Sequence, residues 1–266
     1  MVDNIILFPD FQKLKEEVDK LRIELSMLVL ERDELRLVEC KNIEMVYMLE
    51  LGSLEYKVFE AQCVYLRLKR KVELIQAKKN RQEKIVYRQI EDTLDAEFAE
   101  FQKKLDEQVN RMNAAIERSH YDVLSDEETR ELKKLYRRII KALHPDLNPN
   151  LTQAQLDLFN NAVNAYENGD LNALRIIDEM VSEPILSDDH KDAITQLAEE
   201  KERLIDLMKT VKESIEKIKS EFPYTVKELI NDPKKIAARK AELKSIMHEY
   251  EEAIAAYNAR IEEMLR

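Results

Sequence analysis

Apolar residues recur along most of this chain at steps of three and four, the spacing that places side chains on one face of a helix. Five long stretches show the pattern, over about residues 10–50, 54–75, 82–118, 194–222 and 236–264. In the first stretch the step from Leu28 to Leu35 is one full heptad. The second stretch either folds back on the first or continues it with a kink at Gly52. The pattern therefore predicts long helices.

The alternation of four- and three-residue steps is typical of helices that pack along one another, as in coiled coils. We therefore expect coiled-coil-like helices whose apolar faces mainly cover each other, in preference to a dedicated ligand groove. In the stretch 194–222, Lys201 occupies the one position of the stripe that should be apolar. Spacing alone leaves open whether any stripe also pairs with a second copy to form a homodimer.

Composition agrees with this helical pattern. The chain has 266 residues with 2 Gly, 6 Pro and no Trp, so it lacks the residues that tight hairpins need. We predict an all-α fold. A glycine-rich phosphate loop is excluded because so few glycines are present. The formal net charge of −11 disfavours nucleic acid as the main ligand.

The cysteines and the apolar runs narrow the class further. Cys40 and Cys63 lie inside helical patterns without the Cys/His spacing of a metal site, so we expect free thiols, no metal and no cofactor. The start of the chain lacks the basic leader of a secretory signal, and no apolar run approaches the ~20 residues needed to cross a bilayer. We therefore expect a cytoplasmic protein that makes no membrane contact.

A basic amphipathic helix is predicted in the middle of the chain. Ser125 and Glu128 form a capping box that begins it, and its apolar face runs from Leu132 to Leu143. The opposite face carries five cations, Lys133, Lys134, Arg137, Arg138 and Lys141. Cations near a helix C-terminus are favoured by the helix dipole. Five of them within nine residues of an otherwise acidic chain exceed what helix capping requires.

The tripeptide His144, Pro145 and Asp146 ends this helix, because proline cannot continue it and removes the preceding residue from helical geometry. A second helix is predicted from about Gln153, with Gly169 after its end and Asp170 as the cap of a further short helix. We expect two antiparallel helices joined by an exposed polar loop, with the tripeptide at its tip.

These residues resemble the J-domains of DnaJ-type co-chaperones. The run LYRRIIKALHPDLNP is similar to the second helix and loop of that family, with Tyr136 eight residues before His144 and with Asn148 and Pro149 in register. The third-helix pattern of the family matches Phe159, Ala162, Ala165, Tyr166 and Glu167. The resemblance covers about residues 119–180.

The first helix of a J-domain carries a Y-x-x-L-G pattern, and here the nearest sequence is Tyr121, Asp122, Val123 and Leu124 without the glycine. We consider the long helix that ends near Arg118 as the segment that packs in its place. Leu147 also replaces the basic residue usually found after the aspartate.

The predicted organisation has three parts. Residues 1–118 form a long-helix region, 119–182 a J-like domain, and 183–266 an antiparallel helical hairpin. Thr225 and Glu228 predict a capping box before a short helix in the last part, and Asp232 with Pro233 predicts the start of the final helix.

The resemblance implies a co-chaperone that binds a DnaK-type (70-kDa heat-shock) chaperone and stimulates its ATPase. In the family the basic helix docks on an acidic surface of the ATPase, and the loop aspartate pairs with an arginine of that partner. The implied partner-binding residues here are His144, Pro145, Asp146, Lys133, Lys134, Arg137, Arg138 and Lys141. The chain itself would catalyse nothing. Because no zinc ribbon or glycine-rich segment is present, we expect a specialised client, of unknown identity, bound by the helical arms.

Two other classes compete with this interpretation. In the first, the chain is a coiled-coil scaffold or adaptor and the tripeptide only stops a helix. In the second, His144 and Asp146 act as acid and base in an enzyme, but two neighbouring loop residues with few convergent polar groups do not make a catalytic pocket. The scaffold is therefore the main alternative.

Overall fold

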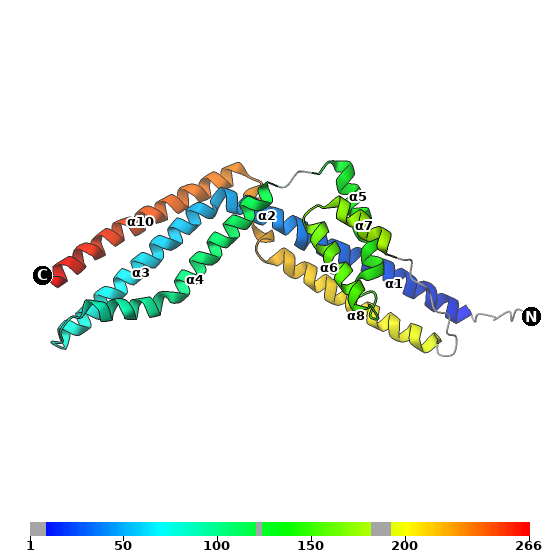
Figure 1. Cartoon of the computed structure of the whole chain (residues 1–266), viewed down its shortest axis with the longest axis horizontal. Helices are drawn as coiled ribbons and strands as arrows, with labels where there is room; N and C mark the ends of the chain where they lie inside the picture. Colours follow the sequence, from blue (N-terminus) through cyan, green and yellow to red (C-terminus); the bar gives the residue numbers. More distant parts are fainter. Residues whose placement is uncertain (1–8, 121–123, 182–192) are drawn as a thin grey trace, which may run out of the picture. The chain divides into compact units, whose positions relative to one another are not determined.

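The computed structural model describes residues 9–120, 124–181 and 193–266, and all regular elements in these ranges are helices, so the predicted all-α fold is confirmed (Figure 1). The elements are α1 (Pro9–Asp33), η1 (Glu34–Glu39), α2 (Cys40–Tyr47), η2 (Met48–Gly52), α3 (Ser53–Asn80), α4 (Tyr87–Ser119), α5 (Asp126–Leu143), α6 (Gln153–Glu167), α7 (Leu171–Met180), α8 (Ala193–Ser220), η3 (Tyr224–Val226), α9 (Lys227–Ile230) and α10 (Pro233–Leu265). The segments η1 and η2 are π-helical, and η3 is a 3-10 turn.

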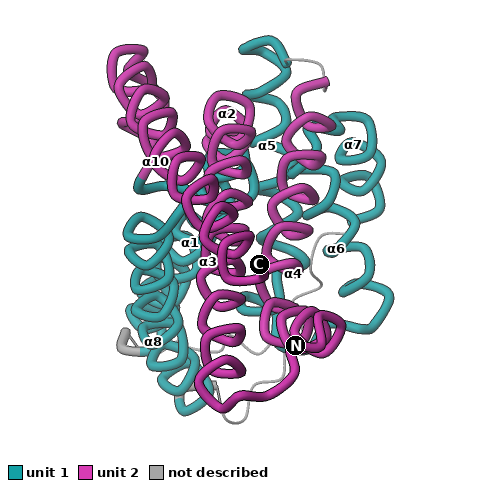
Figure 2. The backbone as a smooth tube through the Cα atoms, turned by 90° about the vertical axis from the view of Figure 1, so that its left-hand side faces the viewer, with its two compact units in different colours: residues 1–41, 121–225 teal, residues 42–120, 226–266 magenta. Residues whose placement is uncertain are grey.

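The chain divides into two compact units, each built from two separate stretches of sequence (Figure 2). Unit 1 comprises residues 1–41 and 121–225, and unit 2 comprises residues 42–120 and 226–266. These boundaries differ from the three consecutive parts predicted from the sequence. Apolar spacing marks where a helix is, but it carries no information on which distant helix will cover it.

In unit 1, α1 and α8 lie side by side and run in the same direction (Figure 1). Their direction follows from the ion pairs between them, because Lys201 pairs with Glu17 at 2.7 Å and Lys219 pairs with Glu31 at 3.1 Å. The charged residue in the stripe of α8, Lys201, is thus accommodated by reaching a carboxylate of α1.

The helices α5, α6 and α7 pack on one another, and α5 also packs on α1. His144 at the end of α5 lies against Phe159, whereas Tyr136 stacks on Tyr166, so α5 and α6 are antiparallel as predicted. Gly169 has a φ of +71°, which suits a glycine after a helix end, and the Asp170 side chain accepts a hydrogen bond from the amide of Ala173 at 2.9 Å. Both predicted helix signals are confirmed.

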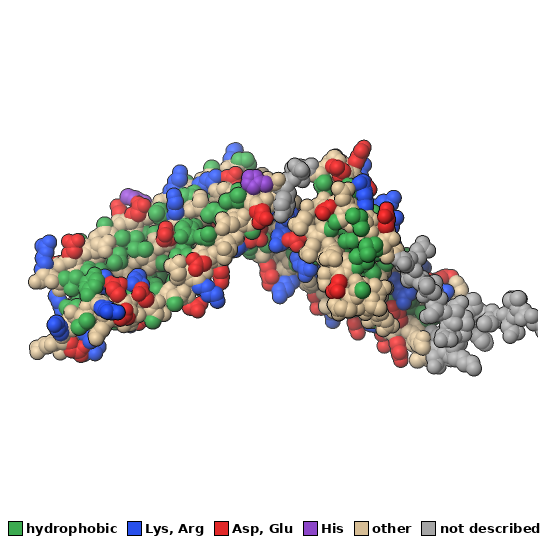
Figure 3. Space-filling model, in the orientation of Figure 1, with side chains coloured by type: hydrophobic (Ala, Val, Ile, Leu, Met, Phe, Trp, Pro, Cys, Tyr) green, Lys and Arg blue, Asp and Glu red, His purple; other side chains and the backbone are tan. Residues whose placement is uncertain are grey.

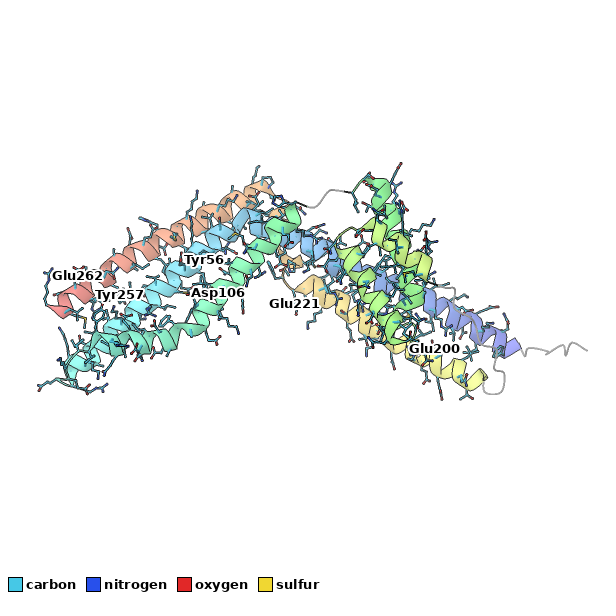
Figure 4. All side chains as sticks on the ribbon, viewed as in Figure 1. Tyr56, Asp106, Glu200, Glu221, Tyr257 and Glu262 are labelled. Carbon is cyan, nitrogen blue, oxygen red and sulfur yellow. The ribbon has the colours of Figure 1, made fainter. Side chains whose placement is uncertain are left out.

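In unit 2, α3 packs against both α4 and α10. The centroid of the Tyr65 ring of α3 lies 5.5 Å from that of Tyr257, which Figure 4 labels on α10. Arg67 of α3 pairs with Glu91 of α4 at 2.7 Å. On the face seen in Figure 3, hydrophobic side chains gather over these helices. The exposed large hydrophobic residues of unit 2, wherever they lie on its surface, are Leu49, Val64, Val86, Tyr87, Val109, Ile116 and Leu265.

The predicted hairpin of the two C-terminal helices is wrong, because α8 uses its apolar face on α1 and α10 uses its own on α3. The capping box predicted at Thr225 is also absent: Thr225 lies inside the 3-10 turn, and Val226 precedes α9 without a side-chain cap. By contrast, Asp232 caps α10 and Pro233 begins it, as predicted.

The sequence left open whether the chain folds back or continues as a helix at Gly52. Residues 9–80 are helical without interruption. Gly52 ends the π-helical segment η2, and a Cβ added there would lie 3.2 Å from the Met48 sulfur. The second apolar stretch therefore continues the first helix and does not fold back on it.

Candidate partner-binding site

The helix α5 begins and ends where local signals place it. The Ser125 hydroxyl accepts a hydrogen bond from the amide of Glu128 at 3.2 Å, and the Glu128 carboxylate accepts one from the amide of Ser125 at 2.9 Å. At the other end His144 has extended backbone angles, φ −70° and ψ 128°, as a residue before proline requires. The capping box and the proline stop are both confirmed.

The tripeptide occupies the turn between α5 and α6, but its three residues are exposed to different degrees. Pro145 is exposed, Asp146 is half-buried, and His144 is only 4% exposed. The turn is fastened to α5 because the Asn148 side-chain amide donates to the carbonyl of Lys141 at 3.1 Å. The prediction of an exposed loop is thus right for Pro145 and wrong for His144, which the helices on either side cover.

One residue of α1, Arg32, contacts the two ionisable groups of the tripeptide. Its Nη2 lies 3.1 Å from His144 Nε2, and its Nη1 lies 3.8 Å from Asp146 Oδ2. The guanidinium is held in place by the neighbouring Asp33, whose Oδ1 accepts from Nε at 3.0 Å and from Nη2 at 2.8 Å. The tripeptide therefore faces a fixed cation of its own chain.

Asp33 also connects this cation to the core of α5. Its side chain is 2% exposed, and its Oδ2 accepts a hydrogen bond from the Tyr136 hydroxyl at 3.0 Å. Tyr136 is fully buried and stacks on Tyr166 with ring centroids 4.0 Å apart. Burial, reinforced by the Asp33 carboxylate, raises the pKa of the Tyr136 hydroxyl, so the phenol stays protonated and donates.

The protonation of His144 follows from its neighbours. Burial lowers the pKa of the imidazole; Asp146 opposes this shift and Arg32 adds to it. The Asp146 amide lies 3.1 Å from Nδ1, while Arg32 faces Nε2, so donors approach both ring nitrogens. A neutral imidazole has one acceptor nitrogen, so it accepts from one of these donors at a time. A protonated imidazole has no acceptor nitrogen and could accept from neither donor. The two donors therefore favour the neutral ring.

A second cation reaches the tripeptide from α8. Arg203 Nη1 donates to the backbone carbonyl of Asp146 at 2.8 Å. Its guanidinium is held by Glu200, at 2.7 Å from Nε, and Glu200 pairs in turn with Arg22 of α1 at 3.2 Å (Figure 4). The side chain of Asp146 and its carbonyl are therefore bound by different helices.

The five cations of α5 do not form one free surface. Lys133 pairs with Glu34 of η1, and Arg138 pairs with Asp178 of α7. Arg137 is half-buried, and its Nε has no hydrogen-bond partner. Lys134 and Lys141 are exposed. All five thus lie on α5, spread over its last three turns, but only part of the predicted surface is open.

A pocket of about 390 Å³ adjoins the turn. It is lined by Asp19, Arg22, Ile23, Lys141, Leu147 and Asn148. Leu147, where the resemblance described above led us to expect a basic residue, is one of the two large apolar residues in this lining, with Ile23 of α1.

Three residues of the site, Arg32, Asp33 and Arg203, were not predicted from the sequence. A signal for Arg32 was present, because steps of four and three from Leu28 to Leu35 place the intermediate position of the stripe at residue 32. A cation at a position that should be apolar indicates a buried partner. Arg203 had no such signal, since it lies outside the apolar stripe of α8.

The helix that packs on α5 differs from the one expected from the sequence. Within unit 1, α1 packs on α5, whereas the helix that ends near Arg118 is α4 and belongs to unit 2. Tyr121, Asp122 and Val123 lie outside the described residues. Leu124 is described, and a Cβ added at Gly169 would lie 3.4 Å from its side chain.

Comparison of the chain with known proteins finds no matching family, no similar curated protein and no similar solved structure. In the described ranges, His, Cys, Asp and Glu side chains form no cluster of three or more that could hold a metal ion. None of the helices described combines the length and the apolarity that crossing a bilayer requires.

Proposed function

We propose that this chain is a J-domain-like co-chaperone that binds a DnaK-type chaperone and stimulates its ATPase. The observation that carries the proposal is the position of Asp146. Its half-exposed carboxylate lies beside exposed Pro145 at the turn between two antiparallel helices, and α5 presents the exposed Lys141 in its last turn and the exposed Lys134 further towards its start. This arrangement offers a carboxylate for a partner's arginine and cations for an acidic surface.

The proposed mechanism requires no chemistry from the chain itself. Exposed cations speed the encounter with an acidic surface, and Asp146 pairs with an arginine of the chaperone. Tighter binding to the hydrolysis-competent state then shifts the chaperone toward that state. The apolar surface of unit 2 is the proposed site for a client or a second copy, and the proposed location is the cytoplasm.

Stimulation of a purified DnaK-type ATPase tests the role of Asp146. We expect Asp146→Asn to abolish stimulation, because the neutral amide cannot form the charge-assisted pair. Asp157→Asn is the matched control, since Asp157 is exposed on α6 and its replacement changes the net charge equally. Equal activity of the two variants would refute the role of Asp146.

The exposed cations are tested by charge reversal. Lys134→Glu combined with Lys141→Glu should raise the concentration needed for half-maximal stimulation by about tenfold or more at low salt, with a smaller effect as salt screens the charges. The same change at Lys209 and Lys212, which are exposed on α8, is the control. The proposal requires a clear difference between the two double variants.

A scaffold is the second candidate, and one observation favours it. The tripeptide is fastened inside its own unit by Arg32 and Arg203, as expected of a packing element. A scaffold predicts no stimulation of any DnaK-type ATPase, and it predicts that Asp146→Asn changes stability without changing any partner interaction.

A further inference from the structure

We propose that α1 and α8 hold the tripeptide in a closed arrangement and compete with the partner chaperone for Asp146. This inference rests on the proposed function and concerns its regulation. Arg32 would then be an intramolecular substitute for the partner's arginine, and Arg203 a second fastening that keeps the turn in place.

Two arginines contact Asp146. Arg32 lies 3.8 Å from the carboxylate, and Arg203 donates to the carbonyl of the same residue at 2.8 Å. The partner's arginine must approach this carboxylate to pair with it. Because a cation is already there, the incoming arginine has to displace Arg32 or share the carboxylate with it.

Both cations are themselves held in place by carboxylates. Arg32 is bound by buried Asp33, and Arg203 is bound by Glu200, which also pairs with Arg22. With Asp146 these groups make three cations and three carboxylates, whose formal charges cancel. A partner's arginine therefore meets a neutral network and not an isolated carboxylate, which weakens its attraction to the turn.

The helical run that supplies Arg32 also contacts the basic face of α5. Lys133 pairs with Glu34, which follows Asp33 directly in the helical run that begins with α1. Consecutive residues of one helix thus engage Asp146, Tyr136 and Lys133. The same helix that supplies Arg32 also neutralises one cation of the surface that would attract an acidic partner.

The contacts of Arg203 and Arg32 with Asp146 are weak enough to be broken by a partner. The side chain of Arg203 is 32% exposed and that of Asp146 is 37% exposed, and contacts between partly exposed charged groups are individually weak. A modest energetic preference for the closed arrangement lowers the apparent affinity for a partner in proportion to the fraction of open molecules. Removing one fastening should therefore increase that affinity measurably.

The test uses the full chain with Arg203→Ala, and with Arg175→Ala as the matched control. Arg175 forms a two-pronged pair with Glu131 in the same unit, so its loss also removes an arginine contact between helices but does not touch the turn. Two quantities are measured: the concentration needed for half-maximal stimulation of a DnaK-type ATPase, and the hydrogen exchange of the amides of residues 146–148. Circular dichroism verifies folding, and Arg203→Lys, which keeps the charge, replaces the alanine variant if that variant unfolds.

We expect Arg203→Ala to lower the half-maximal concentration by about 3- to 10-fold and to speed exchange in the turn, with no such change in Arg175→Ala. The gain must disappear when Asp146→Asn is added. If the chain stimulates the ATPase and Arg203→Ala speeds exchange in the turn without changing that stimulation, the closed arrangement does not regulate partner binding. The proposed function would still stand. If neither the unaltered chain nor Arg203→Ala stimulates any DnaK-type ATPase, the proposed function fails and this inference falls with it. Unchanged exchange together with unchanged stimulation would overturn the inference alone.

Discussion

Asp33 is the residue through which the candidate site is joined to the core of its unit. It is buried, it fixes Arg32 beside the tripeptide, and it accepts the hydroxyl of Tyr136. Burying a polar side chain is costly unless hydrogen-bond donors of this kind compensate the lost water. The sequence predicted that Asp146 lies in a turn just after α5, because the helix must stop before Pro145. The sequence signal at Arg32 indicated a buried partner but did not identify Asp146 as that partner, because Arg32 lies more than 100 positions away. Arg203, 57 positions away, had no signal.

Tyr136→Phe should lower the free energy of unfolding by about 1–3 kcal/mol, because it leaves a carboxylate oxygen of buried Asp33 without its donor. Tyr166→Phe is the matched change in the stacked partner ring. The Tyr166 hydroxyl is buried without a hydrogen-bond partner, so removing it should be neutral or stabilising. Urea unfolding followed by circular dichroism measures both variants, and the reverse order of stabilities would contradict the described network.

Acidification should destabilise unit 1 through His144. The folded-state pKa lies below the ordinary value of 6.5, chiefly because of burial, so the unfolded chain binds the proton first. Stability is therefore retained above about pH 6.5 and lost as the pH falls from there toward the folded-state pKa. The charged groups facing the ring are Asp146, Arg32, Asp33 and Arg36.

Urea unfolding between pH 7.5 and 5 checks this expectation. His144→Gln should lose part of the dependence of stability on pH, because the titrating ring is gone. His248→Gln should keep it, since His248 on α10 is 71% exposed. Parallel curves for the unaltered chain and His144→Gln would show that His144 does not titrate in this range.

At the scale of elements, helix limits were predictable and helix partners were not. The start and end of α5 and the starts of α7 and α10 follow from caps and prolines, which act within a few residues. The pairing of α8 with α1 depends instead on cross-helix contacts such as Lys201 with Glu17. An apolar stripe fits many others, so spacing alone does not select among them.

The two capping boxes predicted from sequence should respond differently to mutation. Ser125→Ala should cost about 1 kcal/mol, because its hydroxyl caps the amide of Glu128 at the start of α5. Thr225→Ala should change stability by less than about 0.5 kcal/mol, since Thr225 is exposed and caps no helix. Chemical denaturation compares the two variants, and equal losses would mean that the predicted box at Thr225 forms in solution.

At the scale of the whole molecule, each unit has its own hydrophobic core. The core of unit 1 brings together residues of α1, η1, α5, α6, α7 and α8, and that of unit 2 joins α3, α4 and α10. Core membership within a helix could be predicted from its stripe, but the assignment of helices to two cores could not.

Leu204→Ala should therefore lower the stability of unit 1 by about 2–5 kcal/mol, because Leu204 is fully buried between α8 and its neighbours. Ile205→Ala is the control, since Ile205 is 47% exposed on the same helix. Hydrogen exchange should become faster in α1, α5 and α8 of the Leu204 variant, while the contacts between α3 and α10 stay protected. Equal acceleration in both units would indicate one cooperative core.

The interleaved order of the two units has a consequence for how the chain is made. Because unit 2 combines residues 42–120 with residues 226–266, a growing chain on the ribosome has produced all of unit 1 before the last helix of unit 2 emerges. During that interval α3 and α4 have each other but lack α10, and the apolar face that α10 later covers is open to water. An apolar face that is covered in the finished protein is therefore accessible to other molecules while the chain is being made.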